Sequence, residues 1–254
     1  MSLRILSRSS TSVLQRIRSS LTSCHSCKRS LNLQEYESKE IMSSHGLRVQ
    51  DFRVLSDPNQ VSSLTSSFQC KEYVVKAQVL AGGRGKGHFR NSGLRGGVRL
   101  TKDPGEAGRL ACSMLQDYLI TAQTPPDGIL VSKVMIAQAL DIDKEYYAAI
   151  LLDRESAGLT GTGIVLVASK CGGMDIEKVA QQDPSAIHKF PLPLHESDFT
   201  IDQARQFVRQ GYDITDETVI DNAAQQILAL HRLFLRTDAT MIEVSHCFPV
   251  CCIT

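Results

Sequence analysis

The feature that most constrains the fold is a glycine-rich segment, Gly82-Gly83-Arg84-Gly85-Lys86-Gly87, that directly follows an apolar stretch over residues 73–81. The apolar stretch is typical of a buried strand because it is rich in Val, Leu and Tyr. Glycine has no Cβ, so backbone N–H groups of the loop can approach phosphate oxygens closely. Arg84 and Lys86 add positive charge at the same place. The segment predicts a phosphate-binding loop, and a solvated basic hairpin tip is the alternative.

Two common phosphate motifs do not fit this loop. A P-loop requires GxxxxGK followed by Ser or Thr, whereas Gly87 is followed by His88. A dinucleotide-binding turn leads into a helix, whereas this loop runs toward Gly96-Gly97-Val98 and a second short strand. The order strand, glycine loop, strand predicts a flexible hairpin lid over a nucleotide.

The N-terminal segment has the composition of an import leader. Residues 1–34 carry six basic residues and no acid, and Glu35 is the first acidic residue of the chain. Basic, Ser-rich and acid-free composition is typical of a mitochondrial transit peptide, which we place at 1–30. A disordered basic tail that binds anionic surfaces is the alternative.

Charge and hydropathy exclude two classes of protein. Without the leader the chain has 22 basic and 27 acidic residues, a net charge of −5, and a nucleic-acid binder usually needs a basic face. We therefore expect no nucleic acid as a partner. No apolar run approaches the ~18–20 residues that span a bilayer, so we expect no membrane insertion. The eight Cys residues do not follow the pattern of a secreted disulfide framework.

Four helices lie among short strands; capping residues mark three of them, and an apolar stripe marks the last one, 217–235. The clearest helix starts after Asp103, with Pro104 as its first residue and Glu106 as the capping-box partner. The predicted helices span 33–44 with Asn32 as cap, 104–118, Thr200 to Gly211, and 217–235. The predicted strands span 73–81, 97–100, 129–136, 146–152, 164–168 and 240–244.

Mixed helices and strands without repeats predict an α/β or α+β fold. The turn at Thr124-Pro125-Pro126-Asp127-Gly128 predicts a subdomain boundary, which gives portions 31–123 and 124–245. The tail 246–254 is rich in Cys, and an alternative end of the coding sequence is the simplest account of it. A thiol metal site and a lipid-modified Cys251 are the alternatives.

Several ordered motifs together resemble one family. They are LNLQEYESKEIMSSHGLRVQ, KAQVLAGGRGKG, NSGLRGGVRLTKDP, ALDIDKEYYAAILLDR and GGMDIEKVA, all within residues 31–245. This set resembles the β subunits of succinate–CoA ligase. The resemblance implies an ATP-grasp fold in two subdomains, here without the family's C-terminal flavodoxin-like CoA-ligase domain.

The resemblance also implies a reaction and a partner. Succinyl-CoA, phosphate and a nucleoside diphosphate would give succinate, CoA and the triphosphate, in the citric acid cycle of the mitochondrial matrix. An α subunit would supply the phosphorylated histidine in a heterodimer, so no catalytic residue is expected in this chain. The β subunit would bind the nucleotide and Mg²⁺.

Site residues follow from the same resemblance. Lys76 and Gly83-Arg84-Gly85 would contact the phosphates, and phosphoryl transfer depends on such positioning and charge neutralisation. Ala139 and Leu140 would lie against the base, and Glu145 would bind the ribose. Gln50 would lie near the base, at the position where the GTP-using members of the family have a glutamine, and this favours GTP and GDP over ATP and ADP. Its amide can both donate to and accept from a guanine edge.

Three of the departures from the family pattern concern the expected site. Gln138, which would also bind the nucleotide, stands where the family usually has Glu, so its amide keeps the hydrogen bonding but loses the charge. Ser245 stands where the family has the Asn that binds Mg²⁺, and a hydroxyl is a weaker ligand for this cation. The second Mg²⁺ ligand of the family would lie beyond Thr254.

These departures predict impaired turnover of a GDP-forming succinate–CoA ligase β subunit. A non-catalytic nucleotide-binding isoform and an ADP-forming acid–CoA ligase subunit are the alternatives.

Overall fold

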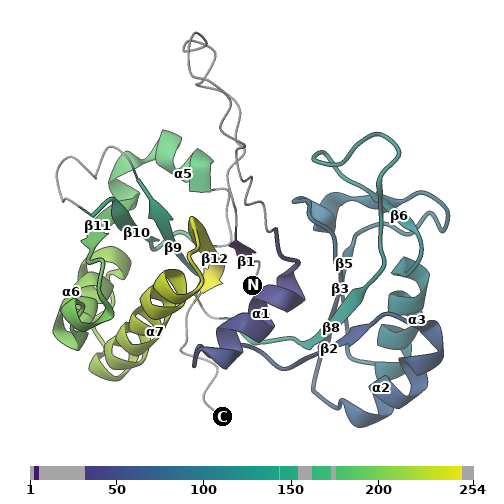
Figure 1. Cartoon of the computed structure of the whole chain (residues 1–254). Helices are drawn as coiled ribbons and strands as arrows, with labels where there is room; N and C mark the ends of the chain where they lie inside the picture. Colours follow the sequence, from purple (N-terminus) through teal and green to yellow (C-terminus); the bar gives the residue numbers. More distant parts are fainter. Residues whose placement is uncertain (1–2, 6–31, 143, 154–161, 173–175, 248–254) are drawn as a thin grey trace, which may run out of the picture. The chain divides into compact units, whose positions relative to one another are not determined.

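The computed structural model describes residues 3–5, 32–142, 144–153, 162–172 and 176–247. They divide into two compact units, shown in Figure 1. The glycine-loop unit comprises Gln34–Glu145, and the C-terminal unit comprises Leu3–Ile5 with Tyr146–Cys247. Most of the predicted leader and the tail after Cys247 lie outside the described residues. The division falls after Glu145, and not at the predicted boundary after 123.

A four-stranded antiparallel sheet forms the centre of the glycine-loop unit. Its order is β2 (Phe52–Leu55), β8 (Val134–Gln138), β3 (Tyr73–Ala77) and β5 (Val98–Thr101). Helices α2 (Val61–Ser67) and α3 (Pro104–Met114) pack on one face. The 3₁₀ turn η1 (Pro58–Gln60) precedes α2.

Alternation along β3 assigns its side chains to the two faces of the sheet. Tyr73, Val75 and Ala77 pack in the core with α3, whereas Val74 packs with Tyr36 of helix α1 (Glu35–Ser44). Successive side chains of a strand point to opposite faces, so Lys76 lies on the same face as Val74. Lys76, which was predicted to contact phosphate, therefore lies on the face of the sheet that packs against α1.

The glycine-rich segment connects β3 to a small second sheet. After the 3₁₀ turn η2 (Arg84–Lys86), strand β4 (His88–Phe89) pairs with β6 (Tyr118–Ile120), which pairs with β7 (Ile129–Leu130). A Cβ at Gly87 would lie 2.7 Å from the backbone oxygen of Ile120. Only glycine therefore fits where the loop crosses β6.

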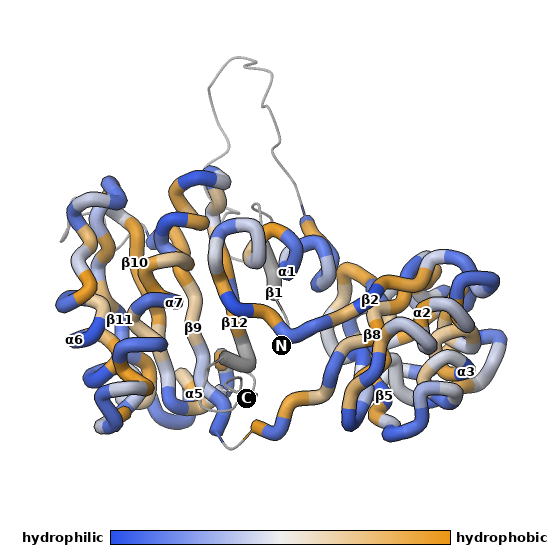
Figure 2. Tube along the Cα trace, turned by 90° about the horizontal axis from the view of Figure 1, so that it is seen from below, coloured by the Kyte–Doolittle hydropathy of each residue, from blue (hydrophilic) through white to orange (hydrophobic). Residues whose placement is uncertain are grey.

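A five-stranded sheet forms the C-terminal unit, in the order β1 (Leu3–Ile5), β12 (Met241–Cys247), β9 (Tyr146–Leu152), β10 (Ile164–Ser169) and β11 (His188–Leu192). All its neighbouring strands are antiparallel. Every residue of β10 is buried, which fits the apolar run Ile164–Ala168 within it. Figure 2 colours much of this strand as hydrophobic. Helices α6 (Ile201–Tyr212) and α7 (Glu217–Arg236) pack against this sheet. The remaining segments are α5 (Ile176–Gln182), η3 (Pro184–Ala186) and η4 (Glu196–Asp198).

Two of the three predicted caps are confirmed. Asp103 accepts hydrogen bonds from the backbone N–H groups of Gly105 and Glu106, and Thr200 forms a capping box with Gln203. The cap predicted at Asn32 is wrong, because α1 starts two residues later, where Gln34 and Glu37 form the capping box. Glu106, predicted as the capping-box partner of Asp103, instead accepts a hydrogen bond from the hydroxyl of Thr101.

Several element boundaries differ from the predictions. Helix α3 ends at Met114, because Gln116 takes a positive φ of 61° and Tyr118 already belongs to β6. Gly211 lies inside α6, which ends at left-handed Asp213. The predicted strand 129–136 is two strands, β7 and β8. Strand β2 and the Ser-rich helix α2 were not predicted, because neither shows a clear apolar period.

None of the described helices is long and apolar enough to cross a membrane.

The contact between α2 and α3 leaves no room for a side chain at Gly108. A Cβ there would lie 2.8 Å from Cγ2 of Val61, and Val is stiff at χ1. Gly108→Ala should therefore destabilise the chain by ~1–3 kcal/mol through overpacking. Urea unfolding followed by circular dichroism measures this change.

Gly105→Ala in the same helix is the matched control. The nearest atoms to its Cβ lie 3.4 Å away or more, so the helix propensity of Ala should make this variant as stable as the parent or more so. Equal destabilisation by both variants would contradict the packing argument.

Candidate functional site

Helix α1 is anchored to the chain that follows β3. The backbone N–H of Tyr36 donates to Oε1 of Gln78 at 3.1 Å, and Nε2 of Gln34 donates to the backbone oxygen of Gln78 at 3.3 Å. The first turn of α1 therefore lies beside the strand that carries Lys76.

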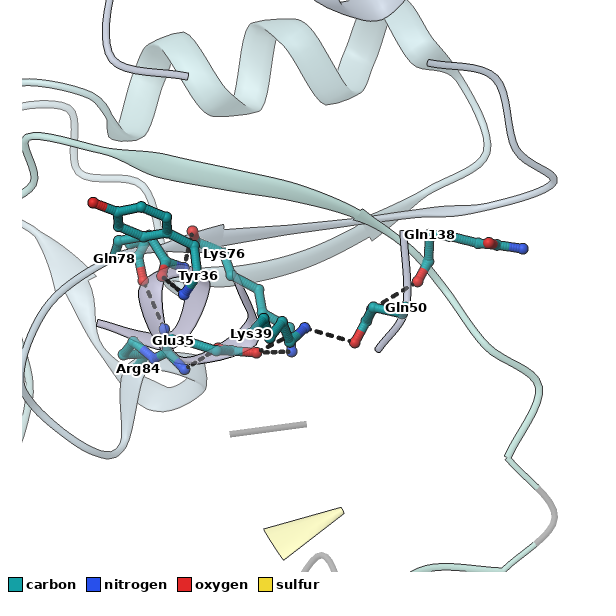
Figure 3. Close-up of polar contacts among 9 residues, drawn as sticks. Glu35, Tyr36, Lys39, Gln50, Lys76, Gln78, Arg84 and Gln138 are labelled. Carbon is teal, nitrogen blue, oxygen red and sulfur yellow. Dashed lines mark hydrogen bonds and ion pairs between the residues drawn. The ribbon is translucent and has the colours of Figure 1, made fainter. Parts of the chain in front are cut away.

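This anchoring places the carboxylate of Glu35 among three cations, shown in Figure 3. Oε1 of Glu35 lies 3.2 Å from Nζ of Lys76 and 3.3 Å from Nζ of Lys39, and Oε2 accepts from Nη2 of Arg84 at 2.7 Å. We call these four residues the Glu35 centre. It brings together Lys76 and Arg84, as the phosphate-site prediction required.

The Glu35 centre is buried although α1 is largely hydrophilic in Figure 2. Glu35 is 4% exposed, Lys39 0% and Lys76 8%. Burial alone raises the pKa of Glu35, but the charges of Lys76, Lys39 and Arg84 outweigh it and hold the pKa well below its usual value. The carboxylate is therefore ionised at neutral pH.

Burial acts in the opposite direction on Lys39. It lowers the pKa of Lys39 to about 8, although the nearby charge of Glu35 opposes this shift. Lys39 is still protonated at pH 7, so the centre holds three positive charges and one negative charge. A buried excess of positive charge favours an anionic ligand.

The loop beside this centre offers backbone donors. Gly83 takes a left-handed conformation with φ of 72°, which starts the turn η2. Among the described residues, the backbone N–H groups of Gly83, Arg84 and Gly85 have no acceptor. Successive free N–H groups form an anion-binding concavity. The predicted phosphate contacts at Lys76 and Gly83–Gly85 thus lie on one connected segment.

A cavity of about 510 Å³ is lined by residues between Gly85 and Arg99. It shares only Gly85 with the predicted phosphate residues and has a basic lining. Its lining residues are Gly85, Lys86, Gly87, His88, Gly93, Arg95, Gly96, Val98 and Arg99. Because Lys76 and Arg84 do not line it, this cavity by itself does not define the site.

Gln50 connects the Glu35 centre to the end of β8. Its Oε1 accepts from Nζ of Lys39 at 2.8 Å, and its Nε2 donates to the backbone oxygen of Gln138 at 2.8 Å. Gln138 contributes this carbonyl while its side chain extends away from the centre in Figure 3. Ala139 continues the strand register by donating its N–H to the oxygen of Glu72 at 2.8 Å.

Three other predicted residues lie outside this arrangement. Leu140 is half-buried after β8, and Glu145 is the last described residue of the glycine-loop unit. Ser245 lies on β12 of the C-terminal unit. The roles assigned to them remain predictions.

Among the residues that the structure describes, none of the side chains fits a resident Mg²⁺ site. Mg²⁺ prefers carboxylate and carbonyl oxygens, and Ser245 offers only a hydroxyl. In the part of the chain that the structure describes, no three His, Cys, Asp or Glu side chains form a metal-binding group.

Sequence reasoning missed Glu35 and Lys39 as site residues. The signal for them is the spacing of four in the EYESK segment, which places both on one face of a helix. Such a pair is normally solvated, so the pattern could not indicate that this face is buried against Lys76.

The Glu35 centre predicts a stability that depends on acid pH. Glu35→Gln leaves three buried cations without their counter-charge, which should cost about 3 kcal/mol or more at pH 7. The pKa of Glu35 is below its unfolded value of 4.5, so the ionised carboxylate stabilises the fold above pH 4.5 and loses this effect as the pH falls further. Urea unfolding at pH 7, 5, 4 and 3 should show the difference between parent and variant shrinking below pH 4.5.

Glu40→Gln is the control, because Glu40 is exposed on the same helix. It should change stability by less than about 0.5 kcal/mol at each pH. A Glu35→Gln variant as stable as this control at pH 7 would rule out the proposed strength of the centre.

Comparison with known proteins gives one family for most of the chain. Residues 32–247 match the family described as ATP-grasp domain. The chain is 47% identical over 218 residues to the mitochondrial GDP-forming succinate–CoA ligase subunit β of Homo sapiens, covering 86% of this chain and 48% of that protein. It is 44% identical over 221 residues to the Caenorhabditis elegans protein of the same name, covering 86% of this chain and 51% of that protein.

An ADP-forming relative is also similar. The succinate–CoA ligase subunit β of Blastocystis sp. subtype 1 is 37% identical over 222 residues, covering 85% of this chain and 51% of that protein. The chain thus spans about half the length of the curated relatives that it matches.

Solved structures show the same fold at low identity. The dinucleotide-forming acetyl-coenzyme A synthetase 1 of Ca. Korarchaeum cryptofilum matches with a TM-score of 0.57 and 14% identity, over 84% of this chain and 85% of that chain. ATP citrate lyase of Methanothrix soehngenii matches with a TM-score of 0.54 and 16% identity, over 84% and 46%.

Proposed function

The chain belongs to the ATP-grasp domain family, and we propose that its glycine-loop unit binds the phosphates of a guanine nucleotide as part of a succinate–CoA ligase β subunit. The observation that supports this most strongly is the convergence of Lys76 and Arg84 on Glu35 beside the free N–H groups of Gly83–Gly85.

The donors of this site remain available to a ligand. An ammonium has three N–H donors and a guanidinium has five. Lys76 uses one donor on Glu35, and Arg84 uses one on Glu35 and one on the backbone oxygen of Ala77. The remaining donors and the loop N–H groups can hold two phosphate groups, while Glu35 prevents the cations from separating.

The proposed base is guanine. Gln50 uses one hydrogen of its Nε2 and one lone pair of its Oε1 within the protein, which leaves one donor and one acceptor for a base edge. The names of several relatives in the comparison specify GDP formation, as in Homo sapiens. ADP formation is named for the Blastocystis relative.

The proposed reaction interconverts succinyl-CoA, phosphate and GDP with succinate, CoA and GTP. The reacting histidine would belong to an α subunit, which forms a heterodimer with this chain. The mitochondrial names of relatives and the acid-free residues 1–34 support the mitochondrial matrix as its location.

Ser245 favours a second candidate, nucleotide binding without efficient turnover. The hydroxyl of Ser245 would replace the amide with which the family binds Mg²⁺, and would bind the cation more weakly. Turnover would be slow, because phosphoryl transfer requires that the charge of the phosphates be neutralised.

Lys76→Met tests phosphate binding. Loss of one charge-assisted hydrogen bond should weaken GDP binding about 10-fold or more, and it should leave the binding of guanosine unchanged. Isothermal titration calorimetry with GDP, ADP and guanosine measures both. Lys71→Met is the control, because Lys71 is exposed just before β3. Wild-type GDP affinity in Lys76→Met would overturn the proposed phosphate site.

Phosphorylation of a cognate α subunit tests turnover. The chain is co-expressed with the α subunit, and phosphohistidine is measured after GTP and Mg²⁺ are added. We expect weak labelling, which Ser245→Asn should increase by restoring an amide oxygen. Labelling as fast as that by a full-length relative would contradict the impaired turnover. The Lys76→Met binding result would not be affected.

A further inference from the structure

The amide of Gln50 is held at both ends by groups that cannot exchange roles. Oε1 faces Nζ of Lys39, and Nε2 faces the backbone oxygen of Gln138, each at 2.8 Å. Protonated Lys39 can only donate and a backbone carbonyl can only accept. If the amide were flipped, its Nε2 would face the ammonium of Lys39, donor against donor, and its Oε1 would face the carbonyl of Gln138, acceptor against acceptor. The orientation of the Gln50 amide is therefore fixed.

Lys39 is itself held in place from the other side. It is fully buried, and its Nζ contacts Glu35 at 3.3 Å and lies 5.8 Å from the ring centre of Phe52. Its ammonium cannot leave this position without breaking an ion pair in the interior. The Glu35 centre therefore extends through Lys39 to Gln50.

A fixed orientation matters because a free amide can pair with either purine. Guanine presents an acceptor at O6 and adenine presents a donor at N6. The neighbouring ring nitrogen N1 is a donor in guanine and an acceptor in adenine. A glutamine that can flip satisfies both patterns, whereas a glutamine with a fixed amide satisfies one and leaves the other with unpaired polar groups, which costs binding energy.

We propose that Lys39 is a positioning residue for base specificity, which orients Gln50 to accept guanine and reject adenine. This inference rests on the proposed binding of a guanine nucleotide. It assigns to Lys39 an effect on the ratio of ADP to GDP affinity, separate from any effect of its charge on the phosphates. Both nucleotides carry the same diphosphate, so a change in phosphate binding cancels in this ratio.

The test compares three substitutions of Lys39 in the full chain. Lys39→Met removes the donor, Lys39→Gln supplies an amide that can itself flip, and Lys39→Arg keeps a group that only donates. Isothermal titration calorimetry at pH 7, below the pKa of Lys39 at about 8, gives the dissociation constants for GDP and ADP. Circular dichroism checks that each variant is folded. If Lys39→Met does not fold, Lys39→Gln alone provides the test of the lost donor.

The ratio of the ADP to the GDP dissociation constant should fall about 5- to 10-fold in Lys39→Met and Lys39→Gln. It should stay at the wild-type value in Lys39→Arg and in the control Lys71→Met. A folded Met or Gln variant with the wild-type ratio would overturn the role of Lys39. A wild-type chain that binds GDP no better than ADP would instead overturn the proposed guanine specificity.

Discussion

The structure of the glycine-loop unit depends on one buried ion pair network. Glu35 holds Lys76 and Arg84 at 3.2 and 2.7 Å, although neither cation lies on its own helix. Three elements, α1, β3 and the glycine-rich turn η2, are thereby joined at a single carboxylate. Because an isolated buried charge is very costly, each of these elements requires the other two to be in place.

This constraint links stability to function. The same cations that neutralise Glu35 carry the donors left for phosphate, and the surplus of positive charge makes an anion a favourable partner. Backbone geometry completes the arrangement, because the left-handed Gly83 leaves successive N–H groups unpaired beside Arg84. Through Lys39 and Gln50, the network also reaches Gln138 at the end of β8.

Local patterns predicted much of the fold but not all of it. Asp103 and Thr200 were found as caps because their hydrogen bonds span only two or three residues. Helix α7 was found because its apolar stripe repeats every 3.6 residues. Strand β2 and helix α2 were not, because they are held by packing against α3 and β8 rather than by a pattern of their own.

The sequence by itself determined the glycine-rich loop, the lysine on the preceding strand and the order of the motifs that identify the family. These depend on residue type and short spacing, which a chain displays directly. Only the tertiary structure decided that Glu35 is buried between Lys76 and Arg84, which lie 41 and 49 residues further along the chain. It also decided that Gln50 faces Gln138, 88 residues away. Burial and the pairing of distant charges arise from packing of whole elements, and no local period encodes them.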